Sequence, residues 1–294
     1  MIFTASPKRI LLWILISLAV MAVFTGSFWV EFLKMLSFEY ILGRHRASSF
    51  GMLLLCALFL MGGKKQLKEQ TVRRCRKKDL CFILFAGPAL LAAAVLLPPE
   101  QDYMILKPAL ALAGAFALVF GQTARIPLLT LMVYSGAIFF PVLVERYFET
   151  GYARAALAPA EGLAQLLGLP LAVDGQLAGI VTAEGQPVTV TVTAACAGPA
   201  TMGVFLGLFA LMYLDLPIPV GRALAVLFFG IAGTWAQSII RILVIMEAGF
   251  KLGEKALWAA HFWTIYLLFP AWYLVFALVY LKQAGTGRMS QAAG

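Results

Sequence analysis

The chain has 294 residues, of which 62% are hydrophobic and only 13% are charged. Soluble domains contain about 25% charged and about 45–50% apolar residues, so this composition excludes a water-soluble globule and favours an integral membrane protein. The formal net charge of +9 would suggest nucleic-acid binding in a soluble protein. In a membrane protein the same excess reflects which loops lie in the cytoplasm, and we predict no nucleic-acid partner.

Long uncharged segments predict about eight transmembrane helices, since a segment in lipid must satisfy its own backbone groups. The segments are residues 10–30, 47–63, 80–99, 108–124, 126–144, 197–214, 223–240 and 262–281. The first follows Lys8 and Arg9 but is too long for a typical signal peptide, so we expect an anchor. The predicted fold class is an all-α polytopic integral membrane protein, with residues 1–294 forming a single transmembrane domain.

A basic loop between the second and third segments predicts the orientation of the chain. Residues 64–78 hold eight lysines and arginines, which is a strong positive-inside signal; such a loop would also bind anionic lipids. Placing this loop in the cytoplasm puts both termini inside. The expected location is therefore the plasma (inner) membrane, with the lipid bilayer as a partner and residues 145–196 forming an extracytoplasmic loop.

The extracytoplasmic loop has two parts of different character. The first part, through Leu167, predicts a surface helix that contains Tyr152, Leu157 and Leu163. In the second part, three valines alternate with three threonines over residues 188–193, which is the period-two pattern of a strand. Residues 183–186 are expected to form a turn, and residues 178–182 to pair with the strand as a short β-hairpin. This strand leads to Cys196, at the outer end of the sixth segment.

Polar residues also occur where the bilayer disfavours them. Arg241 interrupts the seventh segment, which continues to Met246, about 9 Å before its outer end at Glu247. Intramembrane Arg usually faces the bundle interior or water, although Arg241 could instead snorkel to the headgroups. The residues that share its helical face are Thr234, Gln237 and Ser238. His261 opens the eighth segment on the outer side, where an interfacial His is often only structural.

Three residues from separate segments thus lie at the outer face: Cys196, Arg241 and His261. Thiol acyl transfer needs these residue types, because a thiolate attacks, a neighbouring cation favours the thiolate, and a guanidinium holds the oxyanion. Imidazole can protonate a departing amine near neutral pH. The remaining cysteines, Cys56, Cys75 and Cys81, lie toward the cytoplasm and are expected to be reduced. The Cys and His spacing is not that of a zinc site, and we predict neither a metal nor a cofactor.

The residues around these positions resemble the exosortase/archaeosortase family. The resemblance rests on Ala195-Cys196-Ala197-Gly198, on Ser238-Ile239-Ile240-Arg241-Ile242 and on His261 with its downstream aromatic helix, and it covers residues 188–276 as a catalytic core. It implies a multispanning cysteine protease or transpeptidase with a Cys/Arg/His triad. The implied substrates carry a C-terminal sorting signal, made of a short motif such as Pro-Glu-Pro, a membrane helix and a basic tail. Two positions differ from the family's usual residues, because Ala197 replaces Ser and Ser238 replaces Asn.

The sequence therefore predicts a membrane-embedded cysteine protease or transpeptidase that cleaves C-terminal sorting signals of exported proteins through a thioester on Cys196. Two alternatives belong to other classes. One is a transporter or membrane scaffold with Arg241 as a counter-ion, although no internal repeat typical of transporters is evident. The other is a membrane acyltransferase that depends on His261, in which Cys196 would be dispensable.

Overall fold

The computed structural model describes residues 7–24, 28–30, 33, 47–62, 82–97, 106–121 and 125–292. The chain divides into two compact units, Met1–Ser135 and Gly136–Gly294. The basic loop at residues 64–78, on which the predicted orientation depends, lies outside the described residues, and so do Cys75 and Cys81.

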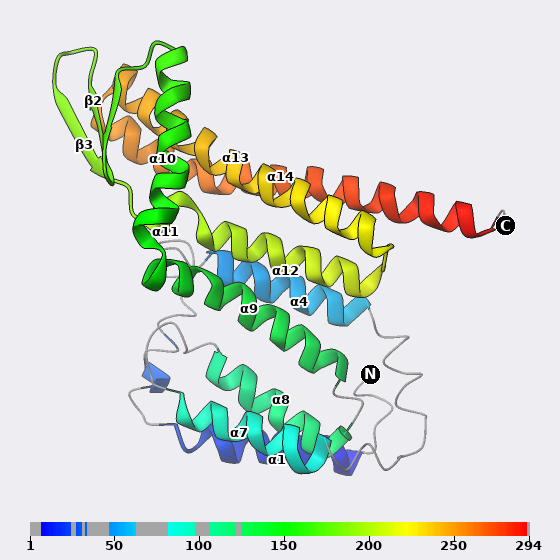
Figure 1. The fold of residues 1–294 in the computed structure, drawn as a ribbon. Helices are drawn as coiled ribbons and strands as arrows, with labels where there is room; N and C mark the ends of the chain where they lie inside the picture. Colours follow the sequence, from blue (N-terminus) through cyan, green and yellow to red (C-terminus); the bar gives the residue numbers. More distant parts are fainter. Residues whose placement is uncertain are drawn as a thin grey trace. The chain divides into compact units, whose positions relative to one another are not determined.

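The first unit consists of apolar helices (Figure 1). They are α1 (Pro7–Met21), α4 (Ala47–Gly62), the π-helical turn η2 (Phe82–Ala86) with α7 (Gly87–Leu96), α8 (Leu106–Phe120) and the start of α9 (Arg125–Tyr147). α7 and α8 pack closely at Gly87 and Gly114, since a Cβ on either glycine would lie 2.7–2.8 Å from a leucine side chain of the other helix. Small residues let helices approach in this way where lipid offers no hydrophobic driving force.

The second unit contains the end of α9, a surface helix, a small sheet and three further helices (Figure 1). These elements are α10 (Glu149–Leu166), β1 (Leu171–Asp174), β2 (Leu177–Val181), β3 (Pro187–Thr191), α11 (Ala194–Ala197), α12 (Pro199–Asp215), α13 (Val220–Leu252) and α14 (Glu254–Ala292). The strands form one antiparallel sheet in the order β1-β2-β3.

The predicted fold class is confirmed. Three described helices are long and apolar enough to cross a membrane, namely Ile126–Tyr147, Val220–Leu252 and Glu254–Gly285. Shorter apolar helices match four more of the predicted segments, at Gly51–Gly62, Leu84–Leu96, Leu106–Phe120 and Pro199–Asp215. α1 lies within the predicted first segment for most of its length. The chain is therefore a helical membrane protein with a small accessory sheet.

α13 and α14 extend further than the sequence predicted. α14 begins at Glu254, whereas the apolar pattern placed the start of that segment at Phe262. The 33 residues of α13 correspond to about 50 Å at 1.5 Å per residue, and the hydrocarbon core of a bilayer is only about 30 Å thick. α13 is therefore longer than the apolar layer is thick.

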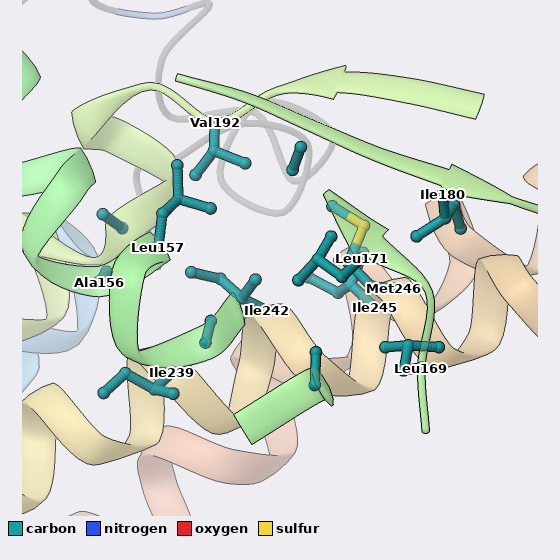
Figure 2. Close-up of a cluster of buried hydrophobic side chains, with 14 of the residues drawn as sticks. Ala156, Leu157, Leu169, Leu171, Ile180, Val192, Ile239, Ile242, Ile245 and Met246 are labelled. Carbon is teal, nitrogen blue, oxygen red and sulfur yellow. The ribbon is translucent and has the colours of Figure 1, made fainter. Parts of the chain in front are cut away.

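The connected ends of α13 and α14 join α10 and the sheet in a separate hydrophobic core, shown in Figure 2. We call this assembly of α10, β1–β3 and the connected ends of α13 and α14 the cap. Its buried core is formed by apolar residues from the helices and from the first two strands, among them Leu157, Leu171, Ile180, Ile242, Ile245, Met246 and Leu257. Leu157 is fully buried, so α10 is a packed amphipathic helix.

The predicted hairpin is also confirmed. β2 pairs with β3 in the register Ala178↔Val190 and Ile180↔Val188, so the valines of β3 lie on one face and its threonines on the other. Val188 and Val190 pack against the cap core. The third strand, β1, was not predicted, because its four residues are too few to show an alternation.

Below the cap, α13 packs against α12 and α14 through two glycines. The ring of Phe205 occupies the space beside Gly230, and the ring of Trp272 lies against Gly233, so a Cβ at either glycine would clash. The Trp272 indole Nε1 donates a hydrogen bond to Thr234 Oγ1 at 3.1 Å. These contacts fix how α13 and α14 face each other and thereby position the polar residues of α13.

Candidate active site

Cys196 lies in a single helical turn between the sheet and the membrane helices. β3 ends at Thr191, and the carbonyl of Thr193 accepts hydrogen bonds from the backbone N–H of Cys196 at 3.0 Å and of Ala197 at 3.2 Å. The Thr193 hydroxyl lies 3.7 Å from Cys196 Sγ and donates to it. The cysteine is partly exposed. A partly accessible thiol is therefore held at the junction of strand and helix.

Gly198 brings this turn close to α13. Its φ of +95° lies in the left-handed region, which only glycine adopts at little cost. A Cβ at this position would lie 2.5 Å from Ser238 Oγ and 3.0 Å from Thr201 Oγ1. The glycine thus allows the chain to end α11, turn, and begin α12 while it touches the polar face of α13.

Arg241 connects α11, α13 and α14 through hydrogen bonds. Its side chain is buried, with 3% exposure, and it does not extend to the surface as a snorkelling side chain would. Nη1 donates to the carbonyl of Cys196 at 3.0 Å, and Nε donates to Thr264 Oγ1 at 3.3 Å. Nη2 contacts both the carbonyl of His261, at 3.3 Å, and its ring Nδ1, at 3.4 Å.

The ring of His261 faces both Arg241 and an aromatic side chain. Nδ1 lies 3.4 Å from Arg241 Nη2, and a guanidinium can only donate hydrogen bonds. The Trp258 ring packs edge-on against the imidazole at a centroid distance of 5.8 Å. His261 is thus held from one side by a cation and from another by an aromatic ring.

In the described part of the chain no carboxylate bonds Arg241. Its hydrogen bonds go to carbonyl oxygens, a hydroxyl and the ring of His261. Burying a charge without an opposite charge is costly. The site is therefore suited to an anion.

The three other predicted polar residues of α13 lie near this cluster but are used differently. The hydroxyls of Thr234 and Ser238 donate to carbonyls of their own helix, at 2.8 Å to Gly230 and at 3.3 Å to Thr234. The side-chain Oε1 of Gln237 is buried and has no hydrogen-bond partner among the described residues. The structure thus brings Cys196, Arg241 and His261 into one cluster. Among the described residues, the side chains of Thr234, Gln237 and Ser238 make no hydrogen bond to Arg241.

Sequence reasoning missed Thr264. Its hydroxyl accepts the Arg241 Nε bond and donates to the carbonyl of Ala260 at 2.7 Å. It lies three residues after His261 and so on the same helical face, which is the signal that could have found it.

Tyr152 was expected only as part of a surface helix, but it packs against the cap core together with Cys196. Burial raises the pKa of Tyr152 to about 12, so it stays a neutral phenol.

A metal centre has no support in the described residues, where no group of three His, Cys, Asp or Glu side chains could hold an ion. The fold and the cluster define a polytopic membrane protein in which a buried guanidinium contacts an imidazole and the backbone carbonyl of a partly exposed cysteine.

A sequence profile of the transmembrane exosortase family matches residues 42–278, which include all three of these residues. The chain belongs to the transmembrane exosortase family, as its resemblance had indicated. It is thus a membrane-embedded enzyme that processes sorting signals. Comparison with curated proteins and with solved structures gave no match.

Proposed function

We propose that this chain is a cysteine transpeptidase or protease that cleaves C-terminal sorting signals of exported, membrane-tethered proteins, with Cys196, Arg241 and His261 as its catalytic residues. The observation that carries the proposal is the buried guanidinium of Arg241, which bonds both the Cys196 backbone and His261 and has no carboxylate partner among the described residues. A Cys196 thiolate or a substrate oxyanion would supply the missing negative charge.

The proposed reaction begins with transfer of the thiol proton to His261. The sulfur forms a bond to the substrate carbonyl carbon, and the carbonyl electron pair moves to oxygen, where Arg241 stabilises the negative charge. When the tetrahedral intermediate collapses, the C–N bond breaks and the imidazolium of His261 protonates the departing amine. The products are a thioester on Cys196 and the released C-terminal segment. Water or an amine then attacks the thioester, with His261 as the base.

The hydrogen bond between Arg241 and His261 has a specific place in this reaction. We assign the resting ring proton to Nε2, so that Nδ1 carries the lone pair and accepts a hydrogen bond from Arg241 Nη2, which lies 3.4 Å away. Protonation of Nδ1 must therefore release this N–H of Arg241. The released donor can then turn to the oxyanion that forms in the same step. Protonation of His261 thus frees an N–H of Arg241 at the moment when the substrate oxygen becomes negatively charged and needs a hydrogen-bond donor.

The experiment that tests the proposal uses a membrane-anchored reporter protein with a Pro-Glu-Pro motif, a membrane helix and a basic tail. Cys196→Ala and Cys196→Ser should both abolish cleavage, seen as persistence of the uncut reporter on immunoblots, while the enzyme stays inserted at normal abundance. Cys56→Ala, at the buried cysteine of α4, is the matched control and should cleave normally. Normal cleavage by Cys196→Ala would refute the thiol mechanism, and normal activity of Cys196→Ser would favour an acyltransferase that relies on His261.

We also propose that the cap and the catalytic cluster face the outside of the plasma (inner) membrane, with both termini in the cytoplasm. The support is the basic composition of residues 64–78. A membrane-impermeant thiol reagent applied to intact cells should label the partly exposed Cys196 and spare Cys75. Labelling of Cys75 without Cys196 would reverse the orientation.

A further inference from the structure

The two edges of the three-stranded sheet differ in how their outward backbone groups are used. On β1, the N–H of Leu171 donates to the carbonyl of Leu169 at 2.8 Å, and the N–H of Val173 donates to the Glu161 carboxylate of α10 at 3.1 Å. The outward donors of this edge are thus bonded within the cap. An edge satisfied in this way cannot accept another strand.

β3 forms the opposite edge. Its register shows which groups face outward, because Val192 N–H donates to the Gln176 carbonyl and Thr182 N–H to the Gln186 carbonyl, both at 2.8 Å. Alternate residues of an antiparallel strand point both backbone groups away from the partner, so Thr189 and Thr191 direct theirs away from β2. Both threonines are exposed, and no partner of these outward groups is recorded among the described residues.

This free edge leads directly to the candidate nucleophile. Thr191 is followed by Val192 and Thr193, and Thr193 contacts Cys196 through both its carbonyl and its hydroxyl. At about 3.3 Å per residue, a peptide laid along β3 reaches the level of the cysteine two or three residues beyond Thr191. Exposed edges of this kind pair with extended peptides unless charges or prolines block them, and β3 has no charged residue and only Pro187 at its start.

We propose that the free edge of β3 binds the extended peptide segment of the substrate that precedes its membrane helix, as an added fourth strand. This inference rests on the proposed function. The N–H and C=O groups of Thr189 and Thr191 supply up to four main-chain hydrogen bonds to the substrate. These bonds hold the peptide in an extended form and direct its scissile carbonyl to the thiol of Cys196.

The connection of β3 to the membrane helices determines the direction of the added strand. β3 runs toward Cys196, and the apolar helix α12 begins at Pro199, directly after it. A substrate with its exported part outside and its C-terminal helix in the bilayer must run in the same direction past the thiol. The added strand is therefore parallel to β3, on a sheet that is otherwise antiparallel.

The first test removes the outward N–H groups by substituting proline. Edge strands tolerate proline where the N–H faces solvent, and β3 already contains one at an outward position, Pro187. Thr189→Pro and Thr191→Pro should each lower the cleavage rate of the reporter at limiting substrate by about three- to tenfold, the loss expected for one hydrogen bond. Thr189→Ala and Thr191→Ala keep the N–H and should stay within about twofold of wild type. Equal rates for the proline and alanine variants, at equal abundance in the membrane, would overturn the proposal.

The second test does not depend on proline being tolerated. In full-length Cys196→Ala enzyme, Thr189→Cys is oxidatively cross-linked to reporters that carry a single cysteine at successive positions before the Pro-Glu-Pro motif. An added strand should cross-link at every second position, because alternate side chains face the same side of a sheet. Asp174→Cys, on the covered edge, is the control and should not cross-link. Absence of cross-links from Thr189→Cys, or cross-links without alternation, would overturn the proposal.

The outcomes separate this inference from the proposed function. If Cys196→Ala abolishes cleavage but the edge variants cleave normally and no alternating cross-links form, the strand-addition proposal fails alone. If Cys196→Ala cleaves normally, the proposed function fails, and the strand-addition proposal, which rests on it, fails as well.

Discussion

α13 carries one arginine near its start and another in its second half, and the two arginines have opposite environments. Arg222 lies near the start of the helix and is exposed, whereas Arg241 is buried and bonded to α11 and α14. They are separated by nineteen residues, or about 28 Å along a helix, which is close to the thickness of the hydrocarbon core. The stretch of α13 between them is therefore long enough to cross the apolar layer.

This comparison shows that residue type and membrane depth do not by themselves identify a functional charge. Arg222 can be hydrated or contact lipid headgroups. Arg241 instead directs its donors into the protein, toward the turn that holds Cys196 and the ring of His261. Burial without a carboxylate partner in the described residues is what distinguishes the candidate site.

The sharpest test of the comparison exchanges each arginine for lysine. Arg241→Lys keeps the charge but loses the planar set of donors that can hold an oxyanion, so we expect a loss of about 10²- to 10³-fold in reporter cleavage. Arg222→Lys should retain most activity. The fraction of cleaved reporter on immunoblots measures both. Similar losses of cleavage for the two variants would show that Arg241 plays no more specific part than the exposed Arg222.

A somewhat smaller loss is expected at the partner of Arg241. His261→Ala removes the proton donor to the leaving amine, which should reduce cleavage by about 10²-fold, and water can supply the proton slowly, so residual turnover remains. Reporter cleavage as a function of pH gives the diagnostic readout. The pH dependence of wild-type cleavage should change in His261→Ala, because the group that transfers the proton has been removed. An unchanged pH profile would assign His261 a purely structural role.

A further test concerns the contact that brings Cys196 to α13. Gly198→Ala places a methyl group against Ser238 Oγ and adds the strain of a left-handed alanine, which costs about 1–2 kcal/mol. We expect about a tenfold loss of cleavage. Adding Ser238→Ala removes the clash but not the backbone strain, so it should restore activity only in part. Full activity of Gly198→Ala alone would mean that the turn has more freedom than its contacts indicate.

The smallest effect is expected at Gln237. Its buried Oε1 has no partner among the described residues, so Gln237→Leu removes an unsatisfied group and costs the free enzyme little. If the amide binds substrate, reporter cleavage should fall by about three- to tenfold at unchanged enzyme abundance. An activity equal to wild type would exclude Gln237 from the supporting residues.

The sequence predicted the membrane helices well because the bilayer imposes long apolar segments, and it predicted β2 and β3 because alternating valines and threonines have a clear period. It could not predict that α13 and α14 continue into the cap, since residues 247–258 include several charged or polar side chains. The cluster of Cys196, Arg241 and His261 was found through topology and residue chemistry. The bond to the Cys196 carbonyl and the contribution of Thr264 depend on side-chain directions, which spacing alone does not reveal.

The packing of the cap on α13 has a consequence for heat inactivation. Ile239, Ile242 and Ile245 belong to the cap core, while Arg241, within the same two turns, bonds the backbone of Cys196 and the ring of His261. The cap therefore cannot loosen without releasing the backbone that positions the guanidinium. Catalysis should be lost on heating at the temperature where the cap melts, even when the membrane helices remain inserted and folded.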